Sequence, residues 1–175
     1  DLDLYVVSGG AAANPGSTVF QDRLYLNDGQ GTFSRSSALP RFTDSGACVS
    51  AMDFDGDGDT DIFVGGRLTP GAYPSLPNSP LLQHDGGTFS DVSAQVAPAL
   101  AKAGMFTDLL WADLDGDQQA ELIATGEWMP ISVFSYDGKQ FRNTTAQYGL
   151  AKQSGWWNCV EAADFDGDGD IDLAA

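Results

Sequence analysis

A nine-residue acidic segment recurs along the chain and limits what the chain can fold into. Asp53–Asp61 reads Asp-Phe-Asp-Gly-Asp-Gly-Asp-Thr-Asp, and Asp164–Asp172 differs from it at one position. Asp113–Glu121 is a looser copy, and Asp1–Asp3 matches the end of a fourth. Alternate carboxylates this close repel one another, so such a segment is poorly stable unless something neutralises it. The intervening glycines permit a sharp turn that brings alternate side chains to one centre.

A hard divalent cation with about six to eight oxygen ligands would neutralise each segment, and calcium fits best. Magnesium keeps more of its waters, and zinc prefers His or Cys, which these loops lack. We expect ligands from the side chains at positions 1, 3, 5 and 9 and from the main-chain carbonyl at position 7. In the three complete loops these residues are Asp53, Asp55, Asp57, Asp59, Asp61, Asp113, Asp115, Asp117, Gln119, Glu121, Asp164, Asp166, Asp168, Asp170 and Asp172. The sequence therefore predicts up to three Ca²⁺ ions, and the middle loop is the weakest because Gln118 replaces a glycine.

An EF-hand loop and a solvated turn are the alternative interpretations of the acidic segments. An EF-hand loop begins in the same way, but it needs an acid at position 12 and a helix on each side. Position 12 is Val64, Ala124 or Ala175, and the acid stands at position 9 in every copy. Short apolar runs follow the loops, which indicates strands. A solvated turn without metal is the alternative for any single copy, and three copies in register argue against it.

Composition narrows the class of protein further. The formal net charge is −17, and 16 of the 25 acidic residues lie in these segments, so the acidity reports metal sites before solubility. Eight Lys and Arg without a basic cluster disfavour nucleic acid as a partner, and no apolar run approaches a membrane span. Cys48 and Cys159 each stand five residues before a loop. Because equivalent sites two repeats apart are too distant for a disulfide, we predict two free, buried thiols.

The repeat period predicts the fold. The acids at position 9 are separated by 58, 60 and 51 residues, and each unit contains the same parts in the same order. An apolar strand follows the loop, then a variable connection, a strand ending in Asp-Gly, a return strand with an aromatic residue, and an inner strand that enters the next loop. We therefore expect an all-β protein, a partial β-propeller of four-stranded antiparallel blades with calcium loops between strands one and two. A solenoid is the alternative stack, although its repeats are usually shorter. The expected units within 1–175 are a partial blade 1–43, blades 44–91 and 104–143, and a partial blade 155–175.

Two connections vary in length and composition. Residues 8–21 and 67–79 are rich in Gly, Pro, Ala, Ser and Asn. We expect them on one face of the array, where they carry recognition or serve only as spacers.

Aromatic residues and the single histidine supply the remaining candidates. Trp128 lies in a short turn and is the better candidate for an exposed, sugar-stacking surface, whereas Trp111 is expected in the core. The pattern leaves Trp156 and Trp157 open between the two. His84 is expected in a surface turn.

An apolar inner strand, then D-x-D-x-D-G-x-x-D, then an apolar strand ending in Gly resembles the FG-GAP repeat, also called the VCBS repeat. Such repeats form the propeller of integrin α-chains and of many bacterial secreted proteins. The run Ser154–Asn158 is similar to bacterial FG-GAP proteins and to relatives of cartilage acidic protein. The resemblance implies a ring of about seven or eight blades with calcium between strands one and two of a blade. We therefore expect this chain to be an excerpt of a larger ring, which pairs with the remaining blades or self-associates through exposed edges.

These observations favour a non-enzymatic, calcium-binding module for protein or glycan recognition, secreted or at the cell surface, where calcium is plentiful. No residue matches an integrin ligand contact. One alternative is the propeller segment of a secreted carbohydrate-active enzyme such as a polysaccharide lyase, which needs a base and a charge-stabilising cation in one cleft. The sequence has no nucleophile elbow, Cys–His pairing or HExxH, so we expect no catalytic residue. A purely architectural spacer is the other alternative.

Overall fold

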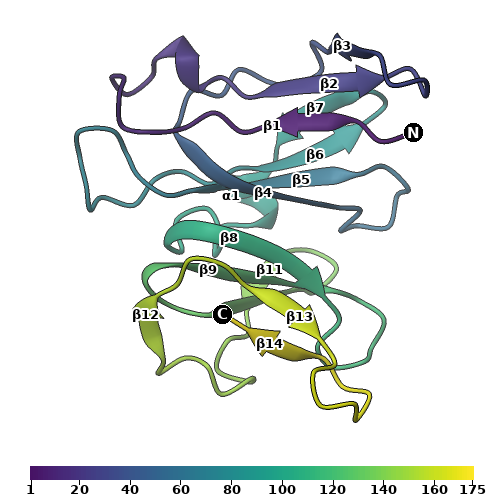
Figure 1. The fold of residues 1–175 in the computed structure, drawn as a ribbon, viewed down its shortest axis with the longest axis vertical. Helices are drawn as coiled ribbons and strands as arrows, with labels where there is room; N and C mark the ends of the chain where they lie inside the picture. Colours follow the sequence, from purple (N-terminus) through teal and green to yellow (C-terminus); the bar gives the residue numbers. More distant parts are fainter.

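Antiparallel β-strands make up almost all of the regular structure in the computed structural model, which describes residues 1–175 (Figure 1). The strands are β1 (Leu4–Val6), β2 (Arg23–Asn27), β3 (Phe33–Arg35), β4 (Gly46–Met52), β5 (Asp61–Gly66), β6 (Leu81–Asp85), β7 (Thr88–Asp91), β8 (Met105–Ala112), β9 (Glu121–Pro130), β10 (Ser132–Tyr136), β11 (Phe141–Asn143), β12 (Ser154–Trp156), β13 (Glu161–Ala163) and β14 (Asp172–Ala174). Two short helices accompany them, η1 (Thr18–Phe20) and α1 (Ser93–Val96), and neither could cross a membrane. The predicted all-β class is confirmed.

The second unit is a complete four-stranded sheet in the order β4-β5-β6-β7. Each strand pairs antiparallel with the next along the chain, and the acidic loop joins β4 to β5. This is the arrangement that the sequence predicts. His84 pairs with Phe89 inside β6 and β7, so its predicted place in a turn is wrong. The strand continues to Asp85, and the ring of His84 stacks on that of Phe89 at 4.5 Å.

The third unit repeats this order and adds one strand. β8, β9, β10 and β11 follow one another, and β12 pairs with the far end of β9. The first strand of the last unit is short, Glu161–Ala163, and pairs with β14 along its whole length. Residues 154–156, just before it, pair instead with the preceding sheet.

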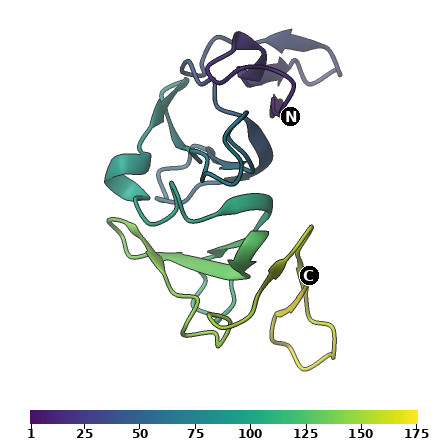
Figure 2. The same cartoon turned by 90° about the vertical axis from the view of Figure 1, so that its left-hand side faces the viewer.

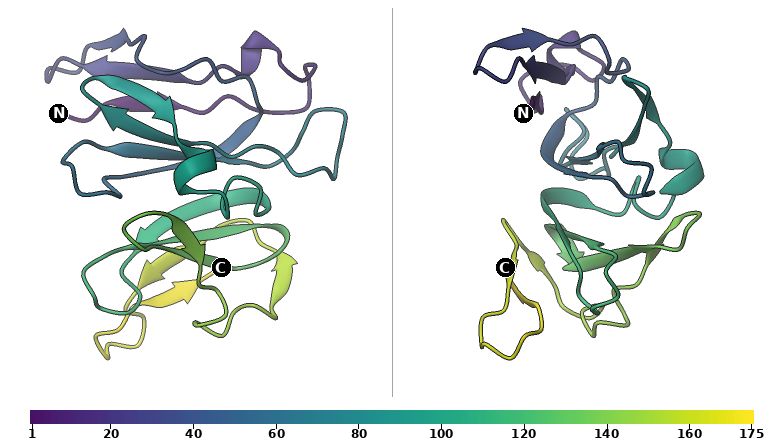
Figure 3. Two further views of the ribbon diagram at one scale, coloured as in Figure 1. Left: turned by 180° about the vertical axis from the view of Figure 1, so that it is seen from behind. Right: turned by 90° about the vertical axis from the view of Figure 1, so that its right-hand side faces the viewer.

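The four sheets follow one another in chain order, with the N-terminal and C-terminal sheets at opposite ends (Figures 1, 2 and 3). The first strands of successive units contact one another, β4 against β8 and β8 against β13. Hydrogen bonds add to the contact between β8 and the last unit. Asp108 accepts one from the amide of Val160 at 3.0 Å. Thr107 likewise donates its hydroxyl to the carbonyl of Trp157 at 2.9 Å.

The main core lies between the two complete sheets. Its buried members are Phe63, Leu81, Ala97, Leu100, Phe106, Leu109, Leu122, Ala124, Met129, Phe134 and Phe141. β5 is buried along its whole length because it has apolar partners on both faces. Phe63 points into the main core, whereas its neighbours Ile62 and Val64 pack toward Tyr5 and Val7 of the first unit. The alternation of side chains along a strand thus lets one strand join two layers.

Both cysteines are free, as predicted, but the predicted burial is wrong for Cys159 and holds only in part for Cys48. Cys48 is half-buried, with its sulfur beside Gly65 and β8 over it. Cys159 is exposed. The two equivalent positions therefore differ in burial.

Candidate metal-binding loops

Each acidic loop connects the first and second strands of its unit. The loops lie at the same end of their sheets, on the right-hand side in Figure 1. In every case the acid at position 9 pairs with the residue just before position 1: Asp61 with Met52, Glu121 with Ala112, and Asp172 with Ala163. The pairing of the flanking strands therefore fixes the length of each loop.

The first carboxylate folds the loop around itself. Asp53 Oδ1 accepts the amides of Gly56 and Asp57 at 2.7 and 3.2 Å, and Oδ2 accepts that of Gly58 at 3.0 Å. Asp113 and Asp164 accept the three corresponding amides of their own loops. These bonds satisfy the turn's amides and hold the carboxylate toward the loop centre.

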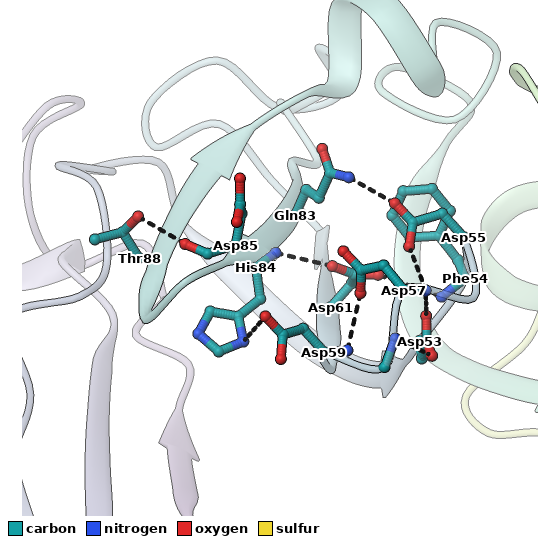
Figure 4. A network of polar contacts seen from close by, with 11 residues as sticks. Asp53, Phe54, Asp55, Asp57, Asp59, Asp61, Gln83, His84, Asp85 and Thr88 are labelled. Carbon is teal, nitrogen blue, oxygen red and sulfur yellow. Dashed lines mark hydrogen bonds and ion pairs between the residues drawn. The ribbon is translucent and has the colours of Figure 1, made fainter.

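The later acids of each loop also follow one pattern, and Figure 4 shows the first loop. The carboxylate at position 3 accepts the amide at position 5, and that at position 5 accepts the amide at position 7. The acid at position 9 accepts the amide at position 2, with distances of 3.2 Å for Asp61, 3.0 Å for Glu121 and 3.1 Å for Asp172. All three loops therefore share one internal geometry.

Carboxylate oxygens converge in each loop. One oxygen from each of three acids lies within 4.8 Å of the other two. The three groups are Asp53, Asp55 and Asp57; Asp113, Asp115 and Glu121; and Asp164, Asp166 and Asp172. The other predicted ligands lie in the same loops outside these groups, and those at position 7 were expected to act through their carbonyls. An all-oxygen donor set suits a hard cation such as Ca²⁺ or Mg²⁺.

The charge at the loops is costly without a cation. Burial raises the pKa of Asp61 to about 6, and Asp55 and Asp57 add to this increase, while hydrogen bonds from His84 and Phe54 oppose it. Burial also raises the pKa of Glu121, helped by the acids of its own loop. A bound cation would favour the ionised form of both groups.

The middle loop keeps the shared geometry despite its weaker sequence. Gln118 has φ of +73°, close to the +94° and +98° of Gly58 and Gly169 at the same position. A side chain in this left-handed region is strained, and glycine is the residue that adopts it freely. Gln118 in place of glycine therefore affects the stability of the middle loop more than its shape.

Two residues that sequence reasoning missed support the first loop from the third strand. Gln83 donates its amide to Asp55 Oδ2 at 2.6 Å, and the backbone amide of His84 donates to Asp61 Oδ1 at 2.8 Å. Figure 4 shows both reaching in from β6. No local signal marks them, because their position depends on the pairing of β5 with β6.

Phe54 anchors the first loop to the next unit. Its ring lies 5.1 Å from that of Tyr136 and 5.5 Å from that of Phe141. Trp111 also packs near Phe141, at 6.0 Å, which fits its predicted place against the core. A cavity of about 500 Å³ lies between the first loop and the middle loop.

A family model described as "FG-GAP-like repeat" matches residues 1–64 and 113–175. The chain belongs to the FG-GAP-like repeat family. The matched parts include all three complete acidic loops, so the family assignment and the loop geometry concern the same residues. The part between the matches, 65–112, carries the rest of the second FG-GAP-like unit and the first strand of the third. A comparison with curated proteins found no match.

Proposed function

We propose that this chain is part of a calcium-stabilised β-propeller that serves as a recognition module rather than an enzyme. The observation that carries the proposal is the threefold recurrence of one loop geometry, with three carboxylate oxygens within 4.8 Å in each loop. A chance cluster of acids has no reason to repeat its hydrogen bonds in every copy. Membership of a family of repeat modules supports the same conclusion.

The propeller is supported by how the units meet. The first strands contact one another along the array, as strands near a common axis do. The large core lies between sheets rather than inside one, so each unit depends on its neighbours. Further blades of the same protein, or a second copy, are the partners we expect at the two end sheets.

Calcium in this proposal is structural. Each ion would join the end of the first strand to the start of the second, and its binding energy would add to the folding energy. Extracellular calcium modules work with dissociation constants of about 10⁻⁴–10⁻³ M, which matches the high calcium outside cells. We therefore place the protein at the cell surface or in secreted form.

Calcium titration by calorimetry tests the proposal. The metal-free chain should bind up to three Ca²⁺ ions, and Mg²⁺ at the same concentration should bind more weakly. Asp55→Asn, Asp115→Asn and Asp166→Asn each remove one converging carboxylate while keeping an oxygen that can accept the loop amide. Each variant should weaken binding at one site.

Asp85→Asn is the control, because it removes an exposed acid outside the loops and should leave all sites intact. An absence of binding at millimolar calcium would rule the proposal out.

A further inference from the structure

An aromatic patch lies at the end of the sheets opposite the acidic loops. Trp128 is 65% exposed, Tyr73 54% and Trp156 49%. They come from the end of β9, from the connection 67–79 and from β12, all on the left-hand side in Figure 1. None of the three belongs to the core, so core packing does not explain why large aromatic side chains occupy these positions.

Trp128 has an unusual backbone conformation. Its φ is +60°, and it is the extra residue of a β-bulge, because β12 pairs Gly155 with Met129 and Trp156 with Glu127. Glycine is the usual residue at a left-handed bulge position. A bulky side chain there is strained, and such strain concentrates where a side chain has to be presented in a fixed direction.

Several contacts hold the indole of Trp128 in place. Its Nε1 donates to the hydroxyl of Tyr73 at 3.0 Å, and that hydroxyl donates to Glu127 Oε2 at 3.0 Å. Glu127 is buried and paired with Arg67 at 2.6 Å. The ring of Trp156 meets that of Trp128 edge to face, with centroids 5.0 Å apart. These contacts fix the direction of the indole before any ligand binds, which lowers the entropic cost of binding.

The hollow beside Trp128 has the size of a small-ligand site. Its volume is about 490 Å³, and Tyr73, Leu76 and Met105 help to line it. Small-ligand sites have volumes of about 300–1,000 Å³, and the volume of this hollow lies within that range.

The chemistry of the patch favours an uncharged ligand with an apolar face and polar edges. Glu127 and Arg67 neutralise each other, so the patch offers no net charge to a peptide or an anion. The side chain of Arg67 is 43% exposed, and Glu127 pairs with its Nε, so its other N–H groups can donate. A pyranose ring has this character, with C–H groups on its faces and hydroxyls around its edge.

We propose that the exposed indole of Trp128 forms a platform on which a pyranose ring of a neutral glycan stacks, that Trp156, set edge to face against Trp128, contacts the sugar from the side, and that Arg67 donates to its hydroxyls. This inference deepens the recognition role proposed above and rests on it. Trp128 and Trp156 would contact the sugar, and Tyr73 would act as a positioning residue for Trp128.

Calorimetric titration of the calcium-loaded chain with cellohexaose, mannohexaose and chitohexaose tests the platform. At least one of these neutral oligosaccharides should bind. Trp128→Gly removes the indole and gives the bulge its preferred residue, so it should weaken binding about tenfold or more while the melting temperature stays equal or rises. Tyr73→Phe keeps the ring and removes both hydrogen bonds, so it should cause a smaller loss.

Phe33→Ala is the matched control, because Phe33 is an exposed aromatic residue on β3, in another sheet, and its loss should not change the affinity. Three outcomes would overturn the platform: no binding of any of the three oligosaccharides, binding that Trp128→Gly leaves unchanged, or a protein partner that occupies the patch instead. Because the calcium titration is a separate measurement, the failure of either idea can be recognised independently.

Discussion

Gln118 and Trp128 are the two non-glycine residues with positive φ, and their sequence contexts differ. Gln118 stands where the sister loops have Gly58 and Gly169, so the repeat itself shows which residue the position prefers. Trp128 has no such counterpart, and its conformation becomes evident only from the pairing of β9 with β12.

Gln118→Gly should stabilise the chain. A non-glycine residue in the left-handed backbone region costs about 1–2 kcal/mol. Glycine avoids this cost but loses more chain entropy on folding, so we expect a net gain of about 0.5–1 kcal/mol in the free energy of unfolding. Urea denaturation measures it. Gly58→Gln is the reciprocal control and should cost a similar amount, since the loops share one geometry. If both changes are neutral, the strain assigned to this position is wrong.

The two thiols should differ in reactivity. Burial raises the pKa of Cys48 to about 12, and the nearby charge of Asp108 adds to the effect, so almost none of it is thiolate at pH 8. Cys159 is exposed. Titration of the folded chain with a chromogenic disulfide reagent at pH 8 should therefore release one equivalent quickly and the second only after unfolding. Two fast equivalents would contradict this.

Asp22 should make stability depend on pH. Its buried carboxylate accepts hydrogen bonds from the amide of Ser8 at 2.6 Å and the hydroxyl of Tyr5 at 2.9 Å. Burial nevertheless raises the pKa of Asp22 above its usual 3.8, against these bonds and Arg23. A raised folded-state pKa gives a contribution that is complete below the unfolded value and is lost as pH rises through the folded one.

Asp22→Asn removes that titration. The melting temperature of the variant relative to the unaltered chain should therefore be higher at pH 7 than at pH 4, whatever the sign of the difference at either pH. Because the same acidic loops are present in both proteins, their own titration cancels in the comparison. An equal difference at both pH values would show that Asp22 titrates as it does in the unfolded chain.

At the scale of elements, the acidic loop links two sheets as well as two strands. Phe54 is half-buried and packs its ring on Tyr136 and Phe141 of the next unit. Phe54→Ala should therefore lower the free energy of unfolding by about 2 kcal/mol, measured by urea denaturation. Phe165 occupies the same position in the third loop but is 59% exposed, so Phe165→Ala is the control and should cost little. Equal losses would contradict the anchoring role.

Local patterns predict the strands that flank the loops. Apolar runs such as that of β5 indicate strands, and the Asp-Gly turns indicate hairpins. The order β4-β5-β6-β7 and the convergence of the acids follow from the sequence for that reason. Three other features cannot be predicted from local patterns, because each depends on the register between distant segments. They are the hydrogen bond from Gln83, the pairing of β12 with β9 and the bulge at Trp128.

At the scale of the whole molecule, the repeated acidic loops dominate the charge. The formal net charge is −17, and three bound calcium ions would reduce it to −11. Repulsion of this kind destabilises a compact state, so cation binding should help every unit of the array and not only the loop that holds the ion. The contacts of β4 with β8 and of β8 with β13 would transmit that gain along the array.

Thermal unfolding with and without calcium tests the central claim most directly. If the loops bind calcium as structural clamps, the melting temperature in excess calcium should exceed that in excess EDTA by about 5–10 °C for each occupied loop, at concentrations about a hundredfold above the dissociation constant. Added calcium should restore the higher value, and the same concentration of magnesium should restore less. An identical melting temperature in excess EDTA and in excess calcium would contradict the account.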